Sequence, residues 1–167
     1  MTILAAVDND VETSAVVEVA VDLAEAYDDE LVVLHVMPQK RFDSLHEAAQ
    51  SPKSSSHFTS SSDSGLPYVE SGRLSGEGYF VDDAMADAAN VADSVVAATV
   101  DDRSNISVEG RVGTPTEEIV DAGQQLDARY IVVGGRKRSP TGKALFGSTT
   151  QSILLEADRP VVTVMSE

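Results

Sequence analysis

Short apolar segments alternate along the chain with longer segments in which apolar residues recur at helical spacing. Continuous apolar runs indicate strands that are buried on both faces, and we expect them at residues 3–7, 31–36, 130–133 and 161–165. Residues 106–112, in which apolar and polar positions partly alternate, indicate a further strand. Segments with a single apolar stripe indicate helices that pack on a sheet, and we expect them at residues 11–27, 79–100, 115–126 and 148–157. The sequence therefore predicts alternating strands and helices.

An open, doubly wound α/β fold is the arrangement that this alternation favours. Buried strands joined by helices form a parallel sheet with helices on both faces, and right-handed crossovers restrict its winding. We expect five mainly parallel strands in the Rossmann-like order 3-2-1-4-5. Ligands of such sheets bind beyond the carboxyl ends of the strands, where the winding direction reverses. Asp8, after the first strand, and Gly134-Gly135, after the fourth, would flank one crevice there.

The pattern is interrupted between Gln39 and Gly78. Eight serines crowd residues 51–64, and the stretch is too polar to offset the loss of chain entropy on ordering. We expect a long, mobile, serine-rich surface insertion at about residues 39–78, with at most a short helix over Ser44–Gln50. The whole chain, residues 1–167, is then a single domain that carries this insertion.

The composition restricts the classes of function. Acidic residues outnumber basic ones by 28 to 12, and the net charge of −16 disfavours binding to nucleic acid or to anionic membranes. Only four residues are lysine. Such an acidic, lysine-poor surface favours the salt-rich cytoplasm of a halophilic archaeon, where ions screen the repulsion, although solubility alone is the simpler explanation.

Several kinds of site and segment are not expected. The chain has no cysteine, and its three histidines do not lie at the spacing of metal ligands, so we predict no disulfide and no metal site. No apolar run reaches the roughly 18 residues that cross a bilayer, and the first 36 residues lack lysine and arginine. We therefore expect a cytoplasmic protein without a membrane segment or a secretory signal.

The most informative segment is residues 134–150. It contains four of the twelve cationic residues, which indicates an anionic partner: Arg136, Lys137, Arg138 and Lys143. Gly147-Ser148-Thr149 then opens a helix, whose free N–H groups suit a phosphate. The spacing does not fit a P-loop, because Gly135 lies too far before Gly142-Lys143. It does not fit a dinucleotide fingerprint either, because Asp8-Asn9-Asp10 follows the first strand.

Four motifs together resemble the universal stress protein family, across nearly the whole chain apart from the insertion. They are Ala6-Val7-Asp8, Leu34-His35-Val36, Arg111-Val112-Gly113-Thr114-Pro115, and Ile131-Val132-Val133-Gly134 running to Gly147-Ser148. The last resembles the family's nucleotide loop, in which glycine, two residues, glycine, nine residues and glycine precede serine or threonine. Gly134, Gly147 and Ser148 match this loop. Lys137 occupies the second glycine position, so that the charge of residues 136–138 would replace close backbone approach.

The resemblance implies that the chain binds ATP or another adenine nucleotide, which Mg²⁺ could accompany. Asp8 would contact the ribose or adenine, the backbone of Val36 the adenine, and the glycine loop the ribose and phosphates. The residues that would bind the nucleotide are Ala6, Val7, Asp8, Val36, Gly134, Gly135, Arg136, Lys137, Arg138, Gly147, Ser148 and Thr149. Taken alone, Asp8 could also be a helix cap, Val36 a packing residue of its strand, and His35 a satisfied packing histidine.

The resemblance also implies a two-fold dimer through the last strand, whose apolar residues are Val161, Val162, Val164 and Met165. It favours a nucleotide-binding module for stress response or signalling that acts through dimerisation and unknown protein partners. Two alternatives stay open. One is a homodimeric interaction protein of the same fold that binds no nucleotide, and the other is a slow ATP hydrolase, for which Asp8 and His35 are the candidate bases. No catalytic residue is assigned.

Overall fold

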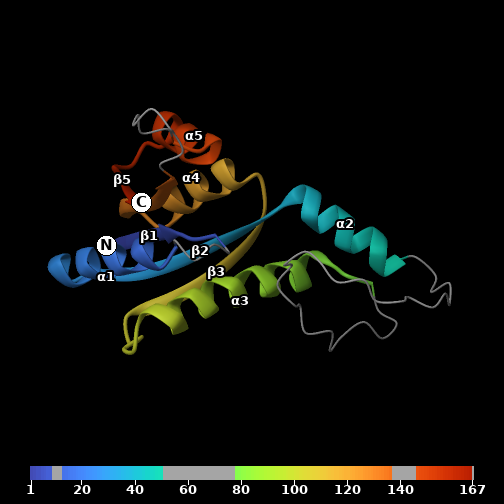
Figure 1. The fold of residues 1–167 in the computed structure, drawn as a ribbon, viewed down its shortest axis with the longest axis horizontal. Coiled ribbons are helices and arrows are strands. Elements are labelled where there is room, and N and C mark those ends of the chain that lie inside the picture. The colour runs from blue at the N-terminus through green and yellow to red at the C-terminus, as the bar shows by residue number, and fades with distance from the viewer. Residues whose placement is uncertain (9–12, 51–77, 137–145, 167) are drawn as a thin grey trace.

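The computed structural model describes residues 1–8, 13–50, 78–136 and 146–166, without the side chains of Arg136 and Ser166. Strands and helices alternate along the chain (Figure 1). The strands are β1 (Thr2–Ala6), β2 (Glu30–Pro38), β3 (Ile106–Gly113), β4 (Ala128–Arg136) and β5 (Val161–Ser166). The helices are α1 (Ser14–Tyr27), α2 (Gln39–Gln50), α3 (Val81–Thr99), α4 (Pro115–Gln125) and α5 (Ser148–Glu156). Within these described ranges, no helix is both long and apolar enough to cross a membrane.

The five strands form one parallel sheet in the order β3-β2-β1-β4-β5. The predicted fold class and strand order are therefore confirmed. The chain first winds from β1 through β2 to β3, and then crosses back to place β4 on the other side of β1. The winding direction thus reverses between β1 and β4, which is where this class of sheet opens a crevice.

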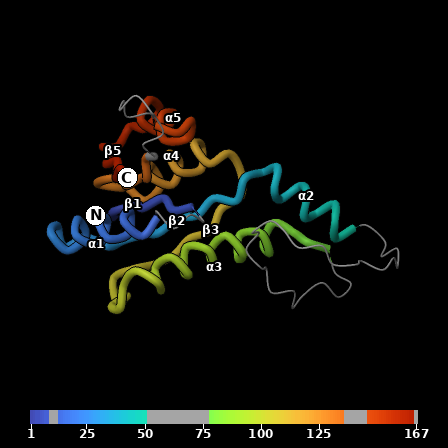
Figure 2. The backbone as a smooth tube through the Cα atoms, in the orientation of Figure 1, coloured from blue at the N-terminus to red at the C-terminus, as the bar shows by residue number. Residues whose placement is uncertain are grey.

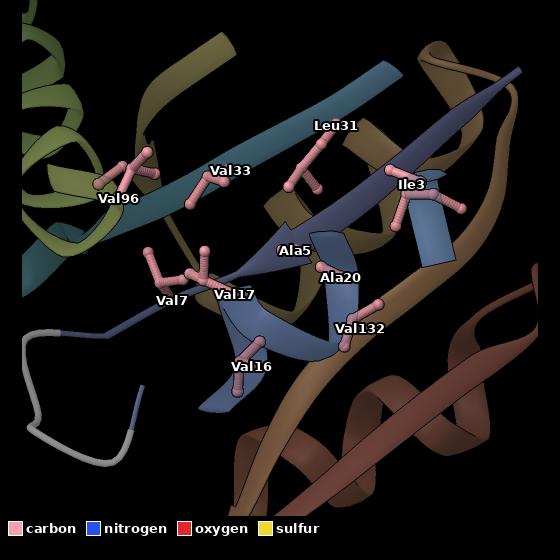
Figure 3. Packing of buried hydrophobic residues seen from close by; sticks show 12 residues of the cluster. Ile3, Ala5, Val7, Val16, Val17, Ala20, Leu31, Val33, Val96 and Val132 are labelled. Atoms are coloured by element: carbon pink, nitrogen blue, oxygen red, sulfur yellow. The ribbon is translucent and has the colours of Figure 1, made fainter. Parts of the chain in front are cut away.

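Helices cover both faces of the sheet, with α1 and α3 on one face and α4 and α5 on the other (Figures 1 and 2). Leu4 faces the second layer, with Ile119 of α4 and Ile153 of α5. Because alternate strand residues enter different helical layers, the inner strands β1, β2 and β4 are mainly apolar. Figure 3 shows strand residues of the first layer, among them Ile3, Ala5, Val7, Leu31, Val33 and Val132.

α3 lies very close to the edge strand β3. The buried side of α3 is formed by small residues, mainly Ala84, Ala88 and Ala92. A Cβ atom on Gly110 of β3 would lie 2.0 Å from the carbonyl oxygen of Met85. No real Cβ tolerates such a contact with backbone, so this packing requires glycine at position 110.

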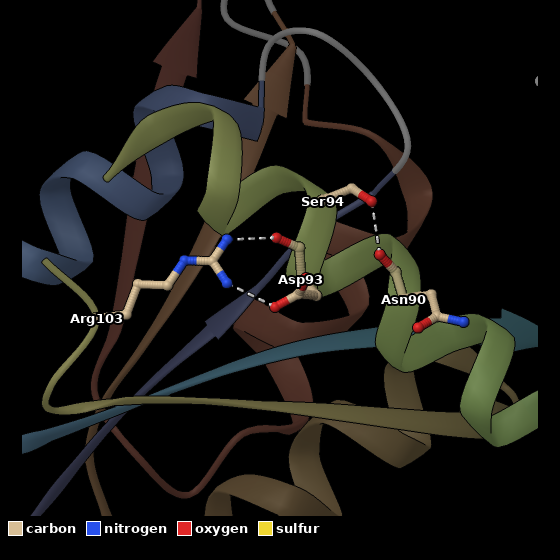
Figure 4. A network of polar contacts seen from close by, with 4 residues as sticks. All are labelled: Asn90, Asp93, Ser94 and Arg103. Atoms are coloured by element: carbon tan, nitrogen blue, oxygen red, sulfur yellow. Dashed lines mark hydrogen bonds and ion pairs between the residues drawn. The ribbon is translucent and has the colours of Figure 1, made fainter. Parts of the chain in front are cut away.

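Polar contacts hold the turn between α3 and β3, at the amino end of the sheet. The guanidinium of Arg103 donates to the Asp93 carboxylate at 2.8 Å and to its carbonyl oxygen at 3.3 Å (Figure 4). Within α3, the hydroxyl of Ser94 donates to the carbonyl oxygen of Asn90 at 2.8 Å. The Arg103 contacts join the end of α3 to the start of β3.

A second polar cluster lies at the amino ends of β1, β2 and β4. The carboxylate of Asp29, whose side chain is 3% exposed, accepts from Arg129 at 2.6 Å and from the Met1 ammonium at 3.0 Å. Hydrogen bonding to Arg129 lowers the pKa of Asp29 below its ordinary value. The Arg129 guanidinium also lies 4.6 Å from the centroid of the Tyr27 ring, whose hydroxyl is 3.3 Å from that of Tyr130.

The expected surface loop is wrong over residues 39–43, which are helical, whereas the helix over Ser44–Gln50 agrees with the short helix expected there. Residues 39–50 form α2, which continues directly from β2 and projects beyond the sheet (Figure 1). Its Phe42 and Leu45 pack on a small cluster around Met37, and His46 Nδ1 donates to the Tyr79 carbonyl oxygen at 2.7 Å. These tertiary contacts stabilise α2, whose sequence is mainly polar. Residues 51–77 lie outside the described residues.

Candidate functional site

A crevice of about 580 Å³ lies at the carboxyl ends of the strands, centred on β1 and β4. This size is within the usual range for sites that hold small molecules. The walls come from the ends of β1, β2 and β4 and from the first turns of α1, α4 and α5. The lining residues are Ala6, Val7, Asp8, Thr13, Val16, His35, Val36, Pro38, Pro115, Ile119, Val133, Gly134, Gly135, Phe146, Gly147, Ser148, Thr149, Thr150, Ile153 and Val164.

The structure brings nine of the twelve sequence-predicted site residues together in this crevice. They are Ala6, Val7, Asp8, Val36, Gly134, Gly135, Gly147, Ser148 and Thr149. Arg136 ends β4, but its side chain is outside the described part of the chain, as are Lys137 and Arg138 entirely. The role of these three basic residues in binding therefore stays a prediction.

Sequence reasoning missed several lining residues, because they depend on how the helices pack. Thr13, Pro115 and Ile119 enter the crevice from α4 and from the start of α1. Phe146 and Thr150 flank the predicted Gly147–Thr149 segment on either side. Only these last two carried a signal, since they are adjacent to the glycine motif in the sequence.

The turn after β1 is fixed by three hydrogen bonds. Val7 N donates to the Leu34 carbonyl oxygen at 2.9 Å, and His35 Nδ1 donates to the Val7 carbonyl oxygen at 2.9 Å. The Thr13 hydroxyl donates to the Asp8 carbonyl oxygen at 3.0 Å. Asp8 is exposed at the crevice, and the N-cap position of α1 is Thr13, whose side chain makes no capping hydrogen bond. The interpretation of Asp8 as a helix cap stays a prediction.

The first turn of α5 lines the crevice and has no side-chain capping hydrogen bond. Its N-cap is Gly147, which has no side chain, and the first helical hydrogen bond runs from Gln151 N to the Gly147 carbonyl oxygen at 2.9 Å. The N–H groups of residues 148–150 therefore have no acceptor within the helix. The Thr150 hydroxyl donates to the Gly134 carbonyl oxygen at 2.7 Å, which ties this turn to the end of β4.

The first turns of the helices differ in charge. Those of α3 and α4 each carry two acidic residues, Asp82 and Asp83 in α3 and Glu117 and Glu118 in α4. The first turn of α5 carries none, and neither do those of α1 and α2. The positive end of its dipole is therefore not neutralised by a side chain of that turn, and an anion would be favoured there.

The glycines of the site differ in why they are needed. Among the described residues, a Cβ on Gly147 would meet no atom within 4 Å, and one on Gly134 would make an ordinary contact with Val16 at 3.4 Å. A Cβ on Gly135 would lie 2.4 Å from Met165 Sδ, so this glycine makes room for a β5 side chain. Packing explains Gly135, whereas the described residues leave the space over Gly147 open.

The described residues hold no group of three or more His, Cys, Asp or Glu side chains that could bind a metal ion. The polar groups of the crevice are mainly backbone N–H groups, hydroxyls and the side chains of Asp8 and His35. Such a set can bind and orient a ligand by hydrogen bonding.

The fold and the crevice define a doubly wound α/β protein with a crevice of ligand size at its switch point. The universal stress protein family model matches residues 1–165. The chain belongs to the universal stress protein family.

One curated relative is similar over part of the chain, and solved structures are similar in fold. A stretch of 49 residues is 47% identical to a universal stress protein of Mycolicibacterium smegmatis, and it covers 29% of this chain and 38% of that relative. A universal stress protein of Archaeoglobus fulgidus has a similar structure, with a TM-score of 0.60, 24% identity and coverage of 98% of this chain and 97% of the other. A universal stress protein from the same organism in complex with dAMP has a TM-score of 0.56 and 19% identity, covering 98% and 96% of the two chains.

Proposed function

We propose that the chain binds an adenine nucleotide, ATP or a close relative, in this crevice. The observation that carries the proposal is the uncapped start of α5, whose N–H groups open onto the crevice in a turn without acidic residues. Phosphate is the ligand that free amides and a helix dipole bind best. The dAMP complex of the Archaeoglobus relative supports adenine as the base.

The charges of the crevice suggest which way the nucleotide lies. The carboxylate of Asp8 repels phosphate, whereas the N-terminus of α5 attracts it. The phosphates would therefore lie against Gly147, Ser148 and Thr149, and the nucleoside near Asp8 and the backbone of Val36. Residues 136–138 add positive charge on the phosphate side, and Mg²⁺ could accompany the phosphates.

The module would act by binding rather than by catalysis. We assign no catalytic residue, and ATP hydrolysis would at most be slow. The edge strand β5 would pair with a second copy of the chain, through Val161, Val162, Val164 and Met165. Binding of nucleotide would then alter assembly or partner choice in a stress-response or signalling role, in the cytoplasm of an organism adapted to salt.

Calorimetric titration at low and high KCl tests the proposal. ATP should bind with one site per chain, and GTP should bind more weakly. Nucleotide retained by the protein after purification in high salt, identified by mass spectrometry, would identify the cellular ligand. Absence of binding by ATP, ADP and AMP would instead favour a homodimeric interaction protein that uses no nucleotide. Phosphate release at high protein concentration would identify a slow hydrolase.

A further inference from the structure

His35 is the most buried titratable side chain of the crevice. It belongs to β2 and is 9% exposed, and its ring lines the crevice beside Val7. Its Nδ1 lies 2.9 Å from the Val7 carbonyl oxygen. A carbonyl oxygen only accepts, so Nδ1 carries the hydrogen, and Nε2 of the neutral ring is left as an acceptor.

The second ring nitrogen faces the crevice. No hydrogen bond to Nε2 occurs within the described residues, where Nδ1 to Val7 is the ring's contact. Yet no buried side-chain nitrogen or oxygen in this part of the chain lacks a partner. Nε2 must therefore be accessible, and the crevice that the ring lines is its access route. The packing interpretation accounts for one nitrogen of His35 but not for the other.

The chemistry of a free acceptor restricts its ligand partner. Phosphate oxygens of a nucleotide accept hydrogen bonds and cannot donate to Nε2 of a neutral imidazole. The donors of an adenine nucleotide are the adenine amino group and the ribose hydroxyls. Nε2 can therefore contact only the nucleoside, which agrees with the phosphates lying across the crevice at α5.

We propose that His35 is a nucleoside-selecting residue, whose Nε2 accepts a hydrogen bond from the adenine amino group or a ribose hydroxyl. This proposal rests on the proposed nucleotide site. It gives the two nitrogens of one ring separate tasks. Nδ1 holds the end of β1 in place, and Nε2 binds the ligand.

Two substitutions separate the tasks, because each amide replaces one nitrogen. The amide of His35→Asn lies near the position of Nδ1, and the amide of His35→Gln near that of Nε2. His35→Asn should keep the donor to Val7 and the thermal stability, but should raise the Kd for ATP about 3- to 10-fold. His35→Gln should bind ATP better than His35→Asn but unfold at a lower temperature. A purely structural role predicts that affinity follows stability in both variants.

The matched control is His46→Asn. His46 also donates from Nδ1 to a carbonyl oxygen, that of Tyr79 at 2.7 Å, but it lies on α2 and does not line the crevice. This variant should bind ATP like the wild type. Calorimetry of all the proteins compared is carried out at the same pH of about 8.

Nucleotide analogues identify the contacted group. Purine riboside triphosphate lacks the amino group, and 2′-deoxy-ATP and 3′-deoxy-ATP each lack one hydroxyl. The analogue that lacks the partner of Nε2 should bind wild type about 3- to 10-fold more weakly than ATP, and this penalty should vanish in His35→Asn. Wild-type affinity in His35→Asn, or penalties that persist for all three analogues, would overturn the role of His35 alone. Failure of wild type to bind ATP would overturn the proposed function as well.

Discussion

Replacing Gly147 by valine should abolish nucleotide binding and leave the fold intact. Gly147 is the N-cap of α5, with φ −61° and ψ 158°, a conformation that any residue adopts. A Cβ here would meet no atom of the described residues within 4 Å. Packing among these residues therefore does not require glycine at this position, whereas the proposed approach of a phosphate to the N–H groups of α5 does.

The magnitude follows from the contacts that the branched side chain would block. A hydrogen bond to a charged group contributes about 1.5–3 kcal/mol, so each lost N–H contact should raise the Kd for ATP about 10- to 150-fold. The free energy of unfolding should change by less than about 1 kcal/mol, because valine is a poorer N-cap than glycine but creates no clash.

A second variant sharpens the test. The carboxylate of Gly147→Asp would cap the same N–H groups, which should stabilise α5 while excluding phosphate. Gly110→Ala is the opposite control, since its Cβ would clash with the Met85 carbonyl oxygen far from the ligand. It should unfold at a lower temperature yet bind ATP normally while folded. Calorimetry and thermal unfolding measure both properties, and an unchanged Kd in Gly147→Val would remove α5 from the site.

Three further predictions concern charge and assembly. Because Arg129 lowers the pKa of Asp29, their ion pair stabilises the fold above the ordinary carboxyl pKa of 3.8 and is lost as the pH falls below it. Arg129→Met should thus shift acid unfolding, followed by circular dichroism, to higher pH, and an unshifted transition would contradict this. Thr163→Pro should give a monomer in analytical ultracentrifugation. Ile131 N donates to the Pro160 carbonyl oxygen at 2.9 Å, and the backbone groups of successive β5 residues point alternately toward β4 and away from it. The N–H of Thr163 therefore points to the open edge of β5, where proline removes it. A monomeric wild type, or a dimeric variant, would refute pairing through this edge. Lys137→Glu should weaken ATP binding by about 1–3 kcal/mol, less at high salt, whereas Lys137→Gly should change it little; equal affinities would mean that residue 137 faces away from the ligand.

The fold was predictable because few topologies suit its pattern. Continuous apolar runs separated by amphipathic helices allow little besides a doubly wound parallel sheet with right-handed crossovers. Element ends were less accurate, since pairing decides them. β4 begins at Ala128 rather than Tyr130, where Ala128 pairs with Thr2 of β1. α2 was missed over residues 39–43 because its partners, such as Tyr79, follow the insertion in the sequence.

The candidate site was predictable where its residues form a local motif. Gly134, Gly147 and Ser148 keep a fixed spacing in the sequence, and the sheet brings them to one crevice with Asp8. Ile119 reaches the same crevice from α4, and nothing in its own sequence context indicates a ligand. His35 shows the limit most clearly. Its burial follows from the strand pattern, but the division between a bonded Nδ1 and an accessible Nε2 depends on the position of the Val7 carbonyl.

The polar groups at the two ends of the sheet differ in the partners that they have, and the difference argues for a ligand. At the amino end, the buried carboxylate of Asp29 has two cationic partners, and Arg103 pairs with Asp93. At the carboxyl end, the start of α5 has neither a side-chain cap nor an acidic residue in its first turn, in a chain with 28 acidic residues. A capping serine or aspartate at position 147 would accept from one of these N–H groups and, relative to glycine, stabilise the helix by only about a few tenths of a kcal/mol. Glycine therefore costs little stability here, and it leaves room beside a crevice of ligand size for the anionic ligand that we propose as the acceptor for these N–H groups.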